Sequence, residues 1–81
     1  MYRYREAVLE ELLRHGVRPT DRTPPRFVKA FVNDLYRFEI RRLRDRLLRG
    51  EIPKPSYASH VIELRRRYPL LSIDIRFWLE P

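Results

Sequence analysis

The sequence contains no cysteine, which excludes disulfides, thiolate nucleophiles and cysteine-based zinc sites. Its only glycines are Gly16 and Gly50, so no glycine-rich loop is available to hold a phosphate group. No apolar run approaches the ~18 residues that a transmembrane helix needs, and the first residues carry no apolar signal core. The sequence therefore predicts a cytoplasmic protein with no membrane anchor and no cofactor.

Side-chain amides are also scarce, because Gln is absent and Asn33 is the only Asn. Lys and Arg number 18 against 11 acidic residues, giving a net charge of +7, and all of these cations except Lys29 and Lys54 are Arg. Few amides and many charges are typical of a thermophile, although a GC-rich genome would produce the same Arg bias. The positive charge favours an acidic partner, either nucleic acid or an acidic protein.

One uninterrupted stretch, residues 24–49, predicts a long central helix. Pro24 and Pro25 suit its first turn, where a missing N–H costs nothing. Thr23 is the expected N-cap and Gly50 the expected stop. At ~1.5 Å per residue the helix would be about 37 Å long, so we expect part of it to project or to meet a partner.

The apolar residues of this helix are distributed unevenly, which predicts a deeply buried first half and a second half that packs along one seam. The wide arc of the first half consists of Phe27, Val28, Phe31, Val32, Leu35, Tyr36 and Phe38. The narrower stripe of the second half consists of Ile40, Leu43 and Leu47.

Two shorter helices are expected at residues 2–15 and 55–68, where apolar side chains recur every three or four positions. Gly16 should end the first of them and Pro69 the other. The short connection after Gly50 makes the long helix and the third helix antiparallel neighbours.

Residues 70–79 alternate between apolar and polar, which is the spacing of a half-buried strand. A lone strand has no partner within the chain, so we expect an extended arm on the helices or a strand shared in a dimer. A short helix capped by Ser72 is the alternative. The fold prediction is one all-α domain over residues 1–81, with three helices, the central one long, plus a short extended C-terminal arm.

Residues 43–70 resemble the short C-terminal (SHOCT) domain, which is a helical hairpin. The resemblance rests on Arg44-Asp45, on the turn Gly50-Glu51-Ile52 and on the aromatic Tyr57 that opens the next helix. Pro53 departs from the family pattern, which usually has Ser or Thr there, followed by acidic residues. The resemblance implies a hairpin and an interaction module, and it carries no catalytic residue.

Glu39 is the most informative single position, because it falls in the middle of the apolar arc. An unpaired buried carboxylate is unfavourable, so it must find a cation or take up a proton. Arg42, one turn later, is the expected partner in a buried ion pair. Two alternatives stay open: a perturbed acid in a pocket beside Tyr36 and Arg42, and an ion pair with a second subunit.

No catalytic, cofactor-binding or metal-binding site is expected. His15 and His60 are the only histidines, and two isolated imidazoles do not supply the three or four ligands of a zinc site. Ser56, Ser59 and Ser72 lack the context of an activated nucleophile. The pattern therefore favours a protein that is not an enzyme.

Two groups of cations are candidate contacts to nucleic acid, since guanidinium pairs bidentately with phosphate. The first group occupies the outer face of the long helix: Arg26, Arg37, Arg41 and Arg44. The second group belongs to the third helix and consists of Arg65, Arg66 and Arg67 near its end and Lys54 at its other end. Asp34 and Asp45 are spaced to pair locally with the first group, and most aromatic residues fall on core stripes, which leaves few for stacking on bases.

The leading functional prediction is a small non-enzymatic interaction module that forms a homodimer. The alternative is a basic accessory protein that binds nucleic acid without sequence specificity. The placement of the Arg side chains discriminates between the two. Arg residues that converge on one face with few acids between them favour nucleic acid, whereas dispersed and paired ones favour the interaction module.

Overall fold

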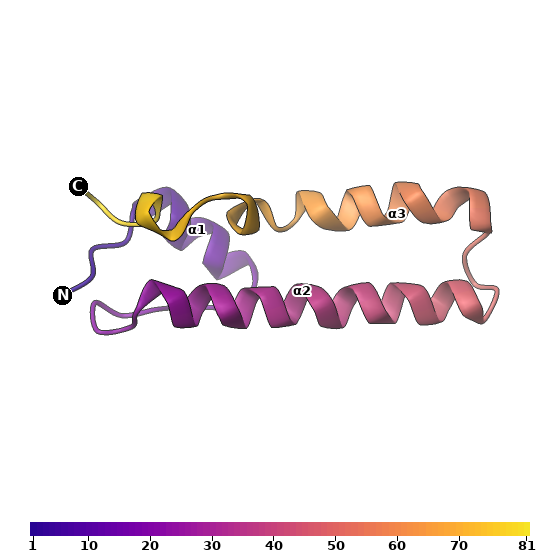
Figure 1. Ribbon diagram of the computed structural model, residues 1–81, viewed down its shortest axis with the longest axis horizontal. Helices are drawn as coiled ribbons and strands as arrows, with labels where there is room; N and C mark the ends of the chain where they lie inside the picture. The colour runs from indigo at the N-terminus through magenta and orange to yellow at the C-terminus, as the bar shows by residue number, and fades with distance from the viewer.

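A computed structural model describes residues 1–81 and shows three α-helices: α1 (Glu6–Arg14), α2 (Pro25–Leu48) and α3 (Lys54–Arg66). This confirms the all-α prediction with a long central helix. α2 and α3 lie side by side and antiparallel, while α1 lies at the end of the molecule where α2 begins (Figure 1). The result is a rod with extents of 48 × 17 × 16 Å.

Prolines start two of the helices and glycines follow two of them. Pro24 and Pro53 are the N-cap residues of α2 and α3, and neither helix has a side-chain cap. Thr23, the expected cap, instead accepts a hydrogen bond through its hydroxyl from the Thr20 backbone N–H at 3.0 Å. Gly16 and Gly50 have φ angles of 74° and 77°, the left-handed region that glycine enters without strain, as expected for the residues that end α1 and α2.

The C-terminal segment is not a strand. It forms two short 3-10 turns, η1 (Pro69–Ser72) and η2 (Ile75–Phe77). The helical alternative was therefore nearer the structure, although its cap is different: the side chain of Asp74 accepts from the Arg76 backbone N–H at 3.0 Å. Extended pairing is limited to one isolated bridge between Tyr4 and Leu79.

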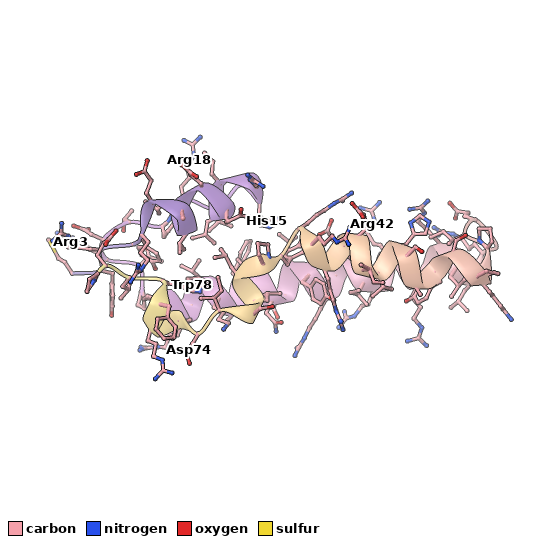
Figure 2. All side chains as sticks on the ribbon, turned by 90° about the horizontal axis from the view of Figure 1, so that it is seen from above. Arg3, His15, Arg18, Arg42, Asp74 and Trp78 are labelled. Carbon is pink, nitrogen blue, oxygen red and sulfur yellow. The ribbon has the colours of Figure 1, made fainter.

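The core is small and lies mainly where α1, α2 and the C-terminal turns meet. Only 11 of 81 residues are buried, and Trp78, Leu12 and Val32 are the largest side chains that are fully covered. Trp78 lies between the C-terminal turns and the helices (Figure 2). Its ring N–H donates to the carbonyl oxygen of Ile73 at 3.2 Å, so the indole is satisfied as well as buried.

The first half of α2 is not deeply buried all round, contrary to the prediction. Val28 and Val32 face the core, but Phe27, Phe31 and Phe38 are 59%, 56% and 55% exposed. At ~100° per residue the three rings fall on one flank of the helix, about a quarter of a turn or more from the buried side. α3 and the C-terminal turns cover too little of the circumference of α2 to reach this flank.

The two ends of the chain are held together by backbone hydrogen bonds. The Arg5 N–H donates to the Trp78 carbonyl at 2.9 Å, and the Glu80 N–H donates to the Arg3 carbonyl at 2.7 Å. The Arg5 side chain adds a bond from Nε to the Leu79 carbonyl at 3.0 Å. This terminal clasp fixes Trp78 over the core.

We predict that Trp78→Ala lowers the free energy of unfolding by ~3–5 kcal/mol, because it opens a large cavity in a fully buried position. Phe77→Ala is the matched control: the neighbouring ring is exposed, so we expect a loss of about 0.5 kcal/mol. Urea unfolding followed by circular dichroism measures both values. Equal losses in the two variants would contradict the central place given to Trp78.

Candidate functional site

Tyr68, the residue two positions after α3, joins all three helices at a polar junction. Its buried ring stacks on His15 at a centroid distance of 4.3 Å and meets the edge of Tyr36 at 5.2 Å. Its hydroxyl donates a hydrogen bond to the Glu39 carboxylate. His15 lies beside the end of α3 (Figure 2), where its Nε2 donates to the Arg67 carbonyl oxygen at 2.7 Å. The C-terminus of α1 is thereby tied to the end of α3.

The environment of Tyr68 raises the pKa of its hydroxyl well above its usual range. Burial is the main cause, because it disfavours the charged phenolate; the hydrogen bond to Glu39 and the charge of that carboxylate act in the same direction. The pKa of Tyr4 is also raised, chiefly by burial, and its hydroxyl donates to the Thr23 carbonyl. Both hydroxyl groups therefore stay protonated and act as fixed donors.

Glu39 is half-buried, but its partner is not the residue expected. No ion pair within 4.0 Å joins it to Arg42, and the carboxylate accepts from the uncharged Tyr68 hydroxyl instead. Arg42 turns toward Phe38 on its own helix, with its guanidinium carbon 5.9 Å from the ring centroid. Tyr68 lies just beyond the end of α3, so its hydroxyl comes from outside the helix that carries Glu39.

A cleft of about 200 Å³ lies between α2 and α3, next to this junction. Its floor is apolar and consists of Leu43 and Leu64, both of which are buried. Its walls are charged or polar: Glu39, Arg42, Arg46, His60, Glu63 and Arg67. We name this feature the α2–α3 cleft; of its wall residues, the sequence analysis placed only Glu39, Arg42 and Arg67 among the candidate site residues.

The predicted cations of α2 converge on one face and lack carboxylate partners. Arg26, Arg37, Arg41 and Arg44 are exposed, and none of them forms an ion pair within 4.0 Å. The expected local pairs with Asp34 and Asp45 are therefore not formed. We call these four residues the Arg ridge. It lies beside the flank that carries the exposed phenylalanines, and the Arg26 guanidinium lies 4.8 Å from the Phe27 ring centroid.

The predicted cations of α3 do not act as one group. Arg65 lines a hollow with Tyr36 and Leu71, while Arg66 pairs with Glu63 at 3.6 Å. Arg67 lines the α2–α3 cleft. The exposed Lys54 lies at the opposite end of the helix.

The two histidines lie apart, His15 in the Tyr68 junction and His60 on the wall of the α2–α3 cleft. No group of three or more His, Asp or Glu side chains is placed to hold a metal ion. None of the helices has the length and hydropathy to cross a membrane.

The exposed aromatic flank is the feature that the sequence analysis missed. Phe27, Phe31 and Phe38 form what we call the Phe stripe, and a hollow of about 230 Å³ adjoins the first two rings beside Val17 and Pro19. The signal was available in the sequence, because the apolar arc of α2 is wider than a single packed neighbour can cover. The part of the arc that the core cannot cover must remain exposed.

We predict that the stability of the protein falls as the pH rises above about 10, the usual pKa of an unfolded tyrosine. The contribution of Tyr68 to the free energy of unfolding is fully present below that pH and is lost above it, because the hydroxyl in the unfolded state releases its proton at a lower pH than in the folded state. The free energy of unfolding should fall by up to about 1.4 kcal/mol per pH unit for one such group. Tyr68→Phe should flatten the decline, and Tyr4 should account for part of the remainder.

Urea unfolding between pH 8 and pH 11 measures this slope. Tyr57→Phe is the control, since its hydroxyl makes no hydrogen bond within the chain. A Tyr68→Phe protein with the slope of the Tyr57→Phe protein would contradict the assignment.

The chain was compared with models of protein families, with curated proteins and with solved structures, and no match was found in any of the three.

Proposed function

We propose that this protein is a small non-enzymatic interaction module whose first partner is a second copy of itself. The observation that carries the proposal is the Phe stripe, three aromatic rings on one flank of α2, each more than half exposed. Exposed apolar residues that occur singly are normal on a protein surface, whereas a contiguous patch marks an interaction site. The likeness of residues 43–70 to the SHOCT hairpin agrees with a role in interaction.

The size of the stripe supports a dimer. A Phe side chain can bury ~150–250 Å², so three rings that are each slightly more than half exposed, from each of two copies, would contribute roughly 500–850 Å² of aromatic surface. A standard interface buries ~1,600 Å² in total. The stripe would thus supply the apolar centre of such an interface, and the surrounding polar residues of α2 would supply its rim.

The order of residues along the stripe suits a two-fold arrangement. If two α2 helices crossed antiparallel with the midpoint between Asp34 and Leu35, Phe31 would meet Phe38 of the second copy. The same register would place Arg42 over Phe27 of the second copy, an arrangement that resembles the contact between Arg26 and Phe27 within one chain. Such an interface is self-complementary, as a two-fold axis requires.

We predict that light scattering at micromolar concentration gives twice the chain mass of 10.0 kDa. The double variant Phe31→Ser/Phe38→Ser should weaken the dimer about 100-fold or more, because each ring loses its burial. Leu48→Ser is the control, since Leu48 is 73% exposed and lies off the stripe. Salt should strengthen this association by screening the repulsion between two chains of +7. A wild-type protein that stays monomeric at high salt would rule the dimer out.

The second candidate function is nucleic-acid binding, and the Arg ridge favours it. Its four guanidinium groups lie on one face with no ion pair, which is the arrangement that the sequence analysis named as the sign of this function. The exposed rings beside the ridge also supply the stacking surfaces that the sequence reading did not find.

If the ridge binds a phosphate backbone, Arg37→Gln, Arg41→Gln and Arg44→Gln together should reduce the log–log salt slope on duplex DNA by roughly 0.9 for each lost contact. The matched control removes three other positive charges, Arg14, Arg66 and Arg76, which are paired with carboxylates. Fluorescence anisotropy over a salt series measures both slopes. Absence of binding to duplex DNA, single strands and structured RNA at low salt would end this second proposal.

A further inference from the structure

The α2–α3 cleft brings together three arginines and a histidine, of which only Arg42 enters either of the two proposed functions. Arg42 and Arg46 are one turn apart on α2, and His60 and Arg67 are two turns apart on α3, so all four side chains border the same hollow. The buried side chains of Leu43 and Leu64 close its floor. The cleft holds about 200 Å³, which is room for a tetrahedral anion together with a few water molecules at about 30 Å³ each.

The three arginines that line the cleft outnumber the two acids that share it. Glu39 accepts from the Tyr68 hydroxyl, and Glu63 pairs with Arg66 on the outer side of α3 at 3.6 Å. Arg42 and Arg67 make no ion pair within 4.0 Å, and Arg46 reaches Glu51 only at 4.0 Å. Three arginine side chains therefore line the hollow against two carboxylates, of which Glu63 is paired with a cation outside the set and Glu39 has only a neutral donor.

We propose that this cleft binds a compact phosphoryl dianion, either inorganic phosphate or the terminal phosphate of a small monoester. A guanidinium group presents N–H donors in a fork that matches two phosphate oxygens. Several such groups around one hollow suit the three terminal oxygens of a phosphoryl dianion better than the two oxygens of a carboxylate. A phosphodiester carries a single charge and continues on both sides, which fits an extended ridge better than a short cleft between two helices.

The binding test is an NMR titration of the ¹⁵N-labelled protein at constant ionic strength with three probes: inorganic phosphate, glycerol 3-phosphate and dimethyl phosphate. We expect saturable shifts at Leu43, His60 and Leu64 with the first two probes, and binding of the diester weaker by about tenfold, the effect of one lost charge-assisted contact. A preference between inorganic phosphate and glycerol 3-phosphate identifies the source of the phosphoryl group.

The double variant Arg46→Gln/Arg67→Gln should lose about tenfold or more in affinity. The control Arg37→Gln/Arg44→Gln makes the same change in net charge on the Arg ridge, and its affinity for phosphate should stay within about twofold of the wild-type value. All four residues are exposed, and the spectrum of each variant reports that it is folded. Neither variant alters the Phe stripe, so the result is independent of dimer formation.

A carboxylate variant tests the electrostatics in the opposite direction. Glu63→Gln should strengthen phosphate binding severalfold, whereas Glu10→Gln, the same change on the exposed part of α1, should leave it unchanged. The proposal is overturned if the shifts do not saturate, if they spread over all Arg residues, or if the Arg ridge control loses as much affinity as the cleft variant.

Discussion

The hydrogen bond from the Tyr68 hydroxyl to the Glu39 carboxylate joins the end of α3 to the middle of α2. The placement of the other elements around α2 depends on this contact. The same ring stacks on His15, so α1 is placed by it too. Across to the C-terminal part of the chain, α2 makes only one other side-chain hydrogen bond, from Lys29 to the Ile73 carbonyl at 3.0 Å. A half-buried carboxylate in a chain rich in Arg is thus satisfied by a neutral donor and forms no ion pair with the arginines that line the cleft beside it.

The thinness of the rod explains why one helix carries so much surface. With only 11 buried residues, the chain covers α2 on the side that meets α3 and the C-terminal turns. The remaining circumference is divided into an apolar flank, the Phe stripe, and a cationic flank, the Arg ridge. The first suits another apolar surface and the second suits an anion, so the two proposed functions use different sides of one helix and respond to salt in opposite ways.

Local rules predicted the helices well, because prolines and glycines determine where they begin and end and the apolar period is clear within them. They failed where a tertiary contact decided the outcome. The alternating pattern over residues 70–79 predicted an extended arm, whereas the segment forms 3-10 turns and the side chain of Trp78 is fully buried. The partner of Glu39 was expected one turn along the same helix, but the hydrogen bond comes instead from Tyr68, which follows α3 in the chain. Likewise, spacing alone put the side chain of Phe31 in the core, and only the position of α3 shows that nothing covers it.

The clasp between the chain ends has a consequence for the order of folding. Its hydrogen bonds join Arg3 and Arg5 to Trp78 and Glu80, so they close a loop that contains nearly the whole chain. The entropy lost in closing a loop grows with its length, whereas the α2–α3 hairpin needs only the short turn after Gly50 to bring its helices together. The hairpin should therefore form early and the clasp last. In the folded protein the clasp should likewise open first, and the amide hydrogens of Arg5 and Glu80 should exchange with solvent sooner than those in the middle of α2.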